Sequence, residues 1–190
     1  MNQAPSPTNR AFEELLSENL DALYRTALRL CGAHTADAED LLQDASLRAF
    51  DGFASLRGEA AGRAWLFTIL VRTHLNRVRS AKRRSEVMAA DLEEAAFEEA
   101  IGAWQSVATP EEVLADRQLR ERIGEALDGL EPELRSVVHL TDVEGFPQRE
   151  VARMLEIPEG TVASRLFRAR RILRDRLADT ARDLRLWRRK

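Results

Sequence analysis

Apolar residues recur at intervals of three and four along most of the chain, which is the spacing of one face of an α-helix. Such stripes predict helices over residues 12–30, 36–53 and 65–84. Pro132 and Pro147 open two further helices, because proline is favoured in the first turn of a helix. The alternating pattern of a strand is nearly absent. The sequence therefore predicts an all-α protein.

Turn and cap residues place some of the helix ends. We expect Gly32 to end the first helix and Thr35 to cap the second. Residues 56–62 contain two glycines and are expected to form a loop. Trp65 begins the next apolar stripe, so we expect it in the core rather than as a platform for a base.

The middle of the chain indicates a linker between two domains. Residues 85–108 are rich in acidic side chains and lack a clear helical period. Thr109 and Glu112 then have the spacing of a capping box, which predicts the start of a new helix. We therefore predict two small helical domains, residues 10–84 and 109–180, joined by a flexible acidic linker over 85–108.

Residues 146–177 have the pattern of a helix-turn-helix, with a short helix, a tight turn at 157–160 and a second helix rich in arginine. Such a unit places its second helix in the major groove of DNA. One face of that helix is an apolar stripe of Val162, Leu166, Ala169, Leu173 and Leu177. Another face carries Ser164, Phe167, Arg168 and Arg171. An ordinary solvated helix is the alternative, but so one-sided a charge favours nucleic acid.

The formal net charge of −3 conceals a strong segregation of charge along the chain. Residues 72–84 contain six basic side chains and no acidic one, and residues 165–190 contain eleven basic against three acidic. Between these blocks, residues 86–133 contain fourteen acidic side chains and three arginines. Two basic blocks around an acidic one fit a protein that holds nucleic acid at two places.

Composition argues against several other classes of protein. The one cysteine, Cys31, forms no internal disulfide and is expected as a small core residue of a cytoplasmic protein. The apolar runs are too short to cross a bilayer, and the first residues do not form a secretory signal. His34, His74 and His139 lie far apart, so we predict no metal site, no cofactor and no enzyme activity.

Two stretches of the chain resemble a known family. DAEDLLQDASLRAF, residues 37–50, and the helix-turn-helix region, residues 134–173, resemble bacterial RNA polymerase sigma factors of the two-domain, extracytoplasmic-function type of the sigma-70 family. The resemblance covers about residues 12–180 apart from the linker. It implies a factor that binds core RNA polymerase and directs promoter-specific transcription initiation, of a stress regulon.

The resemblance also implies three sets of contact residues. Contacts to the clamp helices of the largest polymerase subunit are expected from Asp37, Asp40, Gln43 and Asp44. The downstream promoter element would be recognised and opened by Leu56, Arg57, Arg63, Arg72, Asn76 and Arg79, with Lys82, Arg83 and Arg84 tracking phosphates. The upstream element would be read by Arg149, Thr161, Ala163, Ser164, Phe167, Arg168 and Arg171.

Some of these positions depart from the family pattern. Many relatives have phenylalanine where Leu56 stands, asparagine where Arg72 stands, and lysine or arginine where Ala163 stands. Arg168 is suited to the two acceptors of a guanine, and Phe167 to the methyl group of a thymine. Arg149 and Thr161 are suited to phosphates, which position a protein without reading sequence.

The resemblance further implies an anti-sigma factor as a partner, binding between the two domains and covering residues 37–50. Two rival functions remain at this point. A conventional helix-turn-helix regulator that never binds polymerase explains the C-terminal half equally well, but gives residues 37–50 and 72–84 no role. A helical adaptor that binds only proteins leaves the two basic blocks unexplained.

Overall fold

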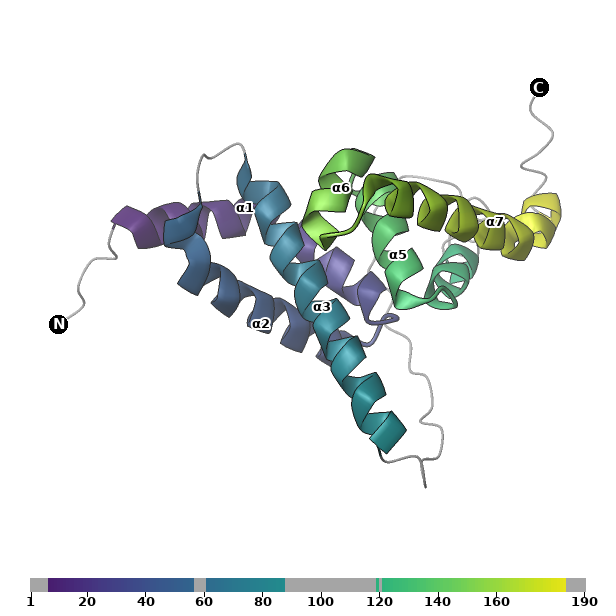
Figure 1. Ribbon diagram of the computed structural model, residues 1–190, viewed down its shortest axis with the longest axis horizontal. Helices are drawn as coiled ribbons and strands as arrows, with labels where there is room; N and C mark the ends of the chain where they lie inside the picture. Colours follow the sequence, from purple (N-terminus) through teal and green to yellow (C-terminus); the bar gives the residue numbers. More distant parts are fainter. Residues whose placement is uncertain (1–6, 57–60, 88–118, 120, 184–190) are drawn as a thin grey trace, which may run out of the picture.

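The computed structural model describes residues 7–56, 61–87, 119 and 121–183, and these are helical throughout apart from turns and short connections (Figure 1). This agrees with the all-α prediction. The predicted linker, beyond Val87, lies outside the described residues, and so do the capping box at Thr109 and the candidate Arg57.

Three helices in mutual contact make the N-terminal domain: α1 (Pro7–Leu30), α2 (Thr35–Gly52) and α3 (Gly62–Val87). A 3-10 turn, η1 (Phe53–Ser55), follows α2. Each helix buries the stripe that its periodicity predicts, and the fully enclosed side chains include Leu41, Phe67 and Leu70. Leu20 has the helical spacing of the apolar stripe of α1 but is an exception, because it is 42% exposed.

Close packing at two points explains local sequence choices in this domain. Gly62 is buried at the start of α3, where a Cβ atom would lie 2.7 Å from Cδ1 of Leu15 on α1. A larger residue would therefore force the side chain of Leu15 or its surroundings to shift. Trp65 packs against the core with its ring centroid 6.3 Å from that of Phe53, as predicted for a core residue.

The predicted cap of α2 is wrong by one residue. His34, with extended backbone, occupies the N-cap position, and Thr35 is already the first helical residue. The side chain of His34 accepts no capping hydrogen bond from the backbone N–H groups of the first turn. Asp37 in the first turn instead provides a negative charge near the helix N-terminus, where the backbone dipole favours it.

The C-terminal domain consists of a helical segment over residues 121–128, then α5 (Pro132–Val138), the π-helical turn η3 (His139–Val143), α6 (Gln148–Leu155) and α7 (Glu159–Asp183). Gly145 has a φ of 77° between η3 and α6. Glycine adopts this left-handed conformation without steric cost, which allows the chain to reverse before the helix-turn-helix.

The turn between α6 and α7 lies earlier than predicted. Glu156, not a glycine, adopts the left-handed conformation that ends α6, with a φ of 54°. The carbonyl of Pro158 accepts bonds from Thr161 and Val162, so α7 begins at Glu159 and includes Gly160. The Pro-Glu-Gly sequence suggested a turn residue at Gly160, but the left-handed turn is made by Glu156, before proline.

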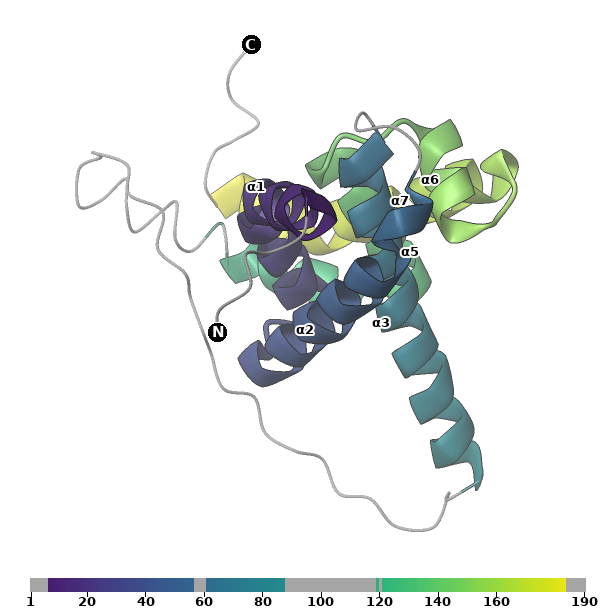
Figure 2. The same ribbon diagram turned by 90° about the vertical axis from the view of Figure 1, so that its left-hand side faces the viewer.

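The two domains pack directly against each other, and their buried residues form one continuous core. α3 contacts both α5 and α6, and α1 contacts α5 (Figures 1 and 2). Phe67 of α3 and Phe146 meet edge to face at a centroid separation of 5.4 Å. We call this set of contacts between the domains the interdomain contact.

Candidate nucleic-acid and polymerase interfaces

The two faces of α7 differ sharply in burial. Val162, Leu166 and Ala169 are at most 2% exposed and hold the helix against α5 and α6. Ala163, Ser164 and Arg168 on the other side are exposed, and Phe167 is 73% exposed. A large aromatic side chain this open to water is unusual, and it stands among the residues expected to face a DNA groove.

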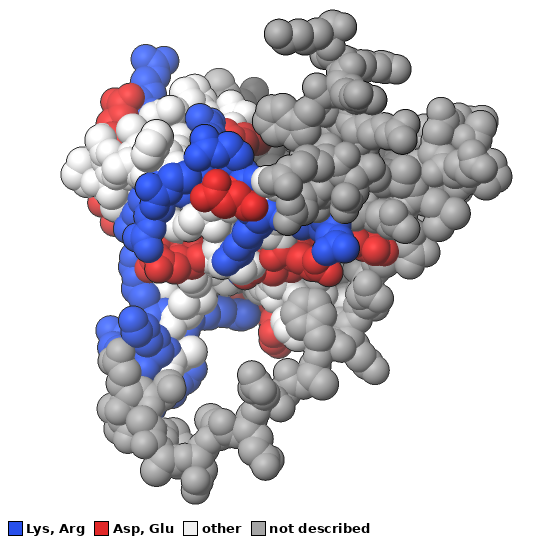
Figure 3. Space-filling view, turned by 90° about the vertical axis from the view of Figure 1, so that its right-hand side faces the viewer, with Lys and Arg blue, Asp and Glu red and all other residues white. Residues whose placement is uncertain are grey.

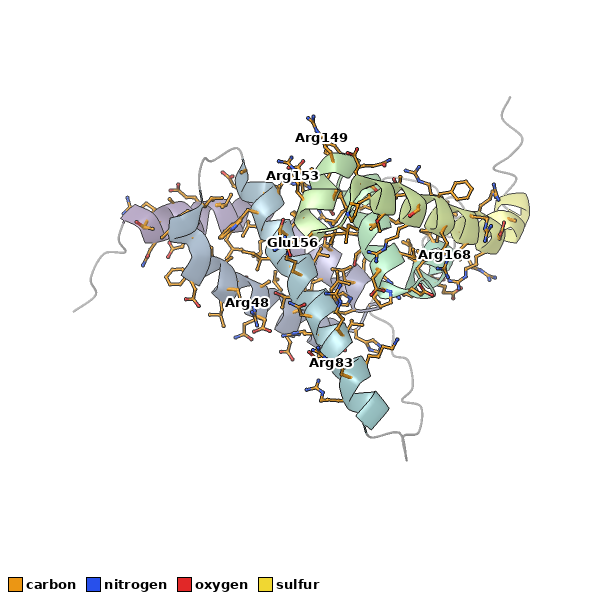
Figure 4. The ribbon with its side chains drawn as sticks, in the orientation of Figure 1. Arg48, Arg83, Arg149, Arg153, Glu156 and Arg168 are labelled. Atoms are coloured by element: carbon orange, nitrogen blue, oxygen red, sulfur yellow. The ribbon has the colours of Figure 1, made fainter. Side chains whose placement is uncertain are left out.

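The polar candidates around α7 are accessible in varying degree. Arg149 and Arg171 are exposed, and Arg149 points away from the body of the molecule at α6 (Figure 4). Thr161 is half-buried. Arg168 lies 3.4 Å from a carboxylate oxygen of Glu131, but both side chains are well exposed, and such pairs contribute little. Arg168 is therefore available to a ligand of higher charge.

Two arginines that flank this face have partners inside the domain. Arg170 forms two hydrogen bonds with Asp142, the shorter at 2.6 Å, and these bonds raise the pKa of its guanidinium. Arg176 donates to the carbonyl of Ala126 at 2.9 Å. Lys and Arg side chains alternate with acidic ones on this side of the molecule (Figure 3). Only part of the positive charge in the sequence is thus free for a partner.

The start of α2 presents the acidic surface expected to contact polymerase. Asp37, Asp40 and Gln43 are exposed. Asp44 is 2.8 Å from Arg77 of α3, so its carboxylate also ties two helices together. Leu47 and Phe50, later on α2, are 59% and 47% exposed. A surface of acidic and large apolar side chains suits a protein partner better than DNA.

The far end of α3 carries exposed cations. Asn76, Arg79, Lys82, Arg83 and Arg84 are all exposed. The last turns of the helix project away from both domains in two perpendicular views, and Arg83 lies on this projection (Figures 1, 2 and 4). Leu56, the first residue of the predicted loop, is half-buried. The projecting end is therefore free to follow a phosphate backbone.

Two other candidates on α3 are occupied by the C-terminal domain. Arg63 is 2.6 Å from a carboxylate oxygen of Glu144, and its guanidinium lies 4.8 and 4.7 Å from the ring centroids of Phe67 and Phe146. Arg72 donates to the carbonyl of Met154 at 2.7 Å and pairs with Glu156 at 2.9 Å. The structure thus separates these two arginines from the rest of the expected downstream set.

Glu144 is the centre of a polar cluster that the sequence reading did not single out. Its side chain is 9% exposed, and Oε1 lies 3.1 Å from Thr26 Oγ1 and 3.4 Å from His139 Nε2. Burial raises the pKa of Glu144, but hydrogen bonds and charge from His139, with Thr26 and Arg63, outweigh it and lower the pKa overall. The one sequence signal was Thr26, a polar residue within the apolar stripe of α1.

Arg135 makes a second group of contacts missed by the sequence reading. From α5 it donates to the carbonyls of Arg29 and Leu30, at 3.3 and 3.1 Å, where α1 ends. It also binds the carbonyl and carboxylate of Asp128 in its own domain. A cation at the C-terminus of a helix satisfies free carbonyls and complements the helix dipole.

The cysteine and the metal-ligating residue types were also singled out from the sequence. Cys31 is half-buried against the core, as expected, and burial raises the pKa of its thiol to about 11. No cluster of three metal-ligating side chains occurs among the described residues. No helix in that part of the chain is long and apolar enough to cross a membrane.

These features describe an all-α protein with a DNA-reading helix-turn-helix and a separate helical domain carrying acidic and cationic surfaces. Residues 15–84 match the family "Sigma-70 region 2", and residues 120–173 match "Sigma-70, region 4". The ECF RNA polymerase sigma-E factor of Escherichia coli (strain K12) is 32% identical over 136 residues, covering 72% of this chain and 71% of its own. The chain belongs to the ECF sigma factors of the sigma-70 family.

Further relatives support the same family over more of the chain. The ECF RNA polymerase sigma factor SigE of Mycolicibacterium smegmatis is 35% identical over 179 residues, covering 93% of this chain and 64% of that protein. Sigma factor RpoE, in its complex with the anti-sigma factor NepR from Bartonella quintana, gives a TM-score of 0.69 at 26% identity, over 89% of this chain and 98% of that one. CnrH in complex with the cytosolic domain of CnrY gives a TM-score of 0.60 at 25% identity, over 90% of each chain.

Proposed function

We propose that this protein binds core RNA polymerase and directs it to specific promoters. The observation that carries this proposal is the presence in one chain of both sigma-70 regions, each with an open surface of the appropriate chemistry. The acidic start of α2 would contact the polymerase. The projecting end of α3 would track the downstream promoter element, and the exposed face of α7 would read the upstream one.

An anti-sigma partner and a stress regulon belong to the same proposal. Two similar solved structures are of complexes: sigma factor RpoE with the anti-sigma factor NepR, and CnrH with the cytosolic domain of CnrY. Such a factor would act in the cytoplasm, where polymerase and chromosome are located. The partner would cover the start of α2, since Asp37 and Asp40 are open there.

Binding to core polymerase tests the proposal most directly, and the structure improves the choice of variant. Reversing Asp44 would break its bond to Arg77 and disturb the domain, whereas Asp40 has an exposed side chain. We expect Asp40→Arg to weaken binding to core enzyme. Asp51→Arg makes the same charge change on an exposed residue at the other end of α2 and should bind as the wild type does.

The same proteins should be assayed for transcription from a supercoiled template with core polymerase added. A stand-alone helix-turn-helix regulator would bind DNA but neither retain polymerase nor start transcripts. Equal affinity of the wild type, Asp40→Arg and Asp51→Arg for core enzyme would contradict the assignment of the α2 surface. Absence of any binding by the wild type would contradict the proposed function as a whole.

A further inference from the structure

We propose that Arg77 is a positioning residue for promoter opening, because it holds the projecting end of α3 in a fixed direction relative to the acidic start of α2. This inference rests on the proposed function and links two surfaces of it, the one that contacts polymerase and the one that tracks the downstream element. The link consists of the ion pair between Arg77 and Asp44 and a hydrogen bond from Arg77 to the backbone of α2.

One nitrogen of Arg77 reaches two points on α2. Its Nη2 lies 2.8 Å from Oδ2 of Asp44 and donates to the backbone carbonyl of Asp40 at 3.0 Å. These two residues are four positions apart, so they lie on the same side of the helix, about one turn from each other. Bonds to both points fix the guanidinium along the axis of α2 as well as across it. Arg77 therefore sets the register between the two helices at this place.

Arg77 stands where α3 leaves the body of its domain. Leu75, two positions earlier, is 6% exposed, whereas residues 81–84 are all exposed. The last turns of the helix project away from both domains in two perpendicular views (Figures 1 and 2). The bonds to α2 thus lie at the base of the projecting end. A contact at the base of a lever controls the direction of its free end.

Asp44 connects these bonds to the polymerase. It belongs to the acidic surface proposed to contact core enzyme, and its side chain is 41% exposed while Oδ2 accepts the bond from Arg77. A carboxylate has two oxygens with about four acceptor positions, so Oδ1 can accept a bond from a cation of the polymerase while Oδ2 keeps Arg77. One carboxylate can therefore join the polymerase to the helix that tracks the downstream element.

The same geometry separates Arg77 from the cations that track phosphates. The charge of Arg77 is balanced by Asp44 inside the domain, whereas Arg79 is exposed and Arg83 and Arg84 follow it on the projecting end. Removing Arg77 should therefore change the placement of the end and leave the number of phosphate contacts as it is. Removing Arg79 should do the opposite.

Hydrogen exchange of the free, full-length protein tests the bonds to α2 directly. Arg77→Met keeps the aliphatic part of the side chain and removes both bonds. It should speed exchange of the backbone amides of residues 81–87 by about threefold, the effect of losing one partly exposed ion pair. Arg79→Met makes the same change on an exposed residue and should leave these rates at the wild-type value. Equal rates in the wild type and Arg77→Met would overturn the proposal, and so would an Arg77→Met protein that fails to fold.

Promoter opening is measured with core polymerase and each full-length variant at saturating concentration. The template is a promoter located by mapping the transcription start made with the wild-type protein, and 2-aminopurine in the melted region reports opening. Arg77→Met should slow opening about threefold. Arg77→Lys restores a cation and a donor at this place and should recover most of the wild-type rate. Mismatches that open the template in advance should remove the defect of Arg77→Met, and a defect that persists on this template would overturn the proposal.

Duplex binding by the free protein distinguishes positioning from a phosphate contact. With a fluorescein-labelled duplex of mixed sequence, Arg77→Met should leave the slope of log affinity against log salt unchanged. Arg79→Met should lower that slope by about 0.9, the contribution of one phosphate contact. An equal reduction by both variants would make Arg77 a phosphate contact and overturn the proposal.

These measurements separate failure of this inference from failure of the proposed function. A wild type that does not bind core polymerase would overturn the proposed function and with it the role of Arg77 in opening, while hydrogen exchange would still decide whether Arg77 fixes the end of α3. Opening at the wild-type rate by Arg77→Met, in a protein that binds polymerase, would overturn the positioning role alone.

Discussion

α3 and α7 are two arginine-rich helices of the molecule, and they present their cations in opposite ways. On α7, the residues expected to face a groove are exposed, and Arg168 has only an exposed, long ion pair. On α3, Arg63 and Arg72 pair with groups of the other domain and are partly exposed, whereas the cations of the projecting end are exposed. A helix rich in arginine is therefore not by itself a free DNA-binding surface.

The difference follows from what each helix packs against. α7 uses a narrow stripe of small and branched residues, so its remaining faces stay in water. α3 is surrounded by α1 and α2 on one side and by α5 and α6 on another, so arginines in its first half meet protein on several sides. Position along the helix, more than charge, decides which cations are available.

The largest effect should come from two neighbouring residues on α7. Leu166 is 2% exposed and fills the domain core, so Leu166→Ala should lower the free energy of unfolding by about 2–5 kcal/mol. Phe167→Ala, one residue later, should change it by less than about 0.5 kcal/mol, because Phe167 is exposed. Urea denaturation of each variant measures the difference.

Duplex binding adds a second comparison between these two variants. The leucine variant should lose DNA binding through unfolding, and the phenylalanine variant should lose it while folded. A stable Leu166→Ala protein with intact DNA binding would contradict the assignment of the two faces.

The next effect concerns the side of α3 that faces the C-terminal domain. His74 is buried, its Nε2 has no hydrogen-bond partner among the described residues, and burial, with the charges of Arg135 and Arg77 against that of Glu133, lowers its pKa to about 4. The unfolded chain binds a proton near pH 6.5, so stability should fall as the pH drops from about 6.5 to 4.

The loss over this window should be about 3 kcal/mol at most, since each unit of pKa shift corresponds to about 1.4 kcal/mol. His74→Leu, which cannot titrate, should remove this part of the pH dependence. Glu144 affects stability at lower pH, because its pKa is lower in the folded protein than in the unfolded chain. Its charged form stabilises the protein above the unfolded pKa, and that stabilisation is lost as the pH falls through the folded pKa. A wild-type stability that is flat between pH 6.5 and 4 would contradict the buried, neutral state of His74.

Substitutions at two sets of arginines should distinguish residues that recognise bases from residues that contact phosphates. Arg168→Ala should cost about 1–3 kcal/mol of promoter binding and relax base preference in the upstream element. Replacing Arg83 and Arg84 by alanine should weaken binding on every sequence and reduce the salt slope by about two units. Competition binding with mutated promoters at several salt concentrations distinguishes the two outcomes, and identical losses on all sequences would contradict both roles.

Local patterns were enough to predict most of the fold, since each helix has its own apolar stripe. The first part of the α7 stripe, Val162, Leu166 and Ala169, was placed correctly, because burial follows the helical period within one element. The interdomain contact was beyond such patterns. Arg63 and Glu144 are 81 positions apart, and the residues around each of them do not indicate that the two side chains pair. Ion pairs of this kind depend on how the two folded domains pack against each other, and the helical spacing of apolar residues does not predict that packing.

Errors at helix ends have a related cause. Thr35 is a better capping residue than His34, yet the structure begins α2 at Thr35. Glycine adopts a positive φ more easily than glutamate does, yet Glu156 rather than Gly160 has the left-handed conformation that ends α6. In both cases the surrounding packing overrides the local preference of the side chain.

The smallest effect tests the residue that ends α6 in the left-handed conformation. Glu156→Gly should raise the free energy of unfolding by about 0.5 kcal/mol, because glycine adopts a φ of 54° without strain. The lost ion pair to Arg72 subtracts little, since the Glu156 side chain is 74% exposed. Arg153→Gly, an exposed position inside α6, is the matched control and should cost about 1 kcal/mol. Thermal denaturation of both variants shows whether Glu156→Gly stabilises the protein and Arg153→Gly destabilises it. If Glu156→Gly were as damaging as Arg153→Gly, the carboxylate of Glu156 would contribute more to holding Arg72 than its exposure allows.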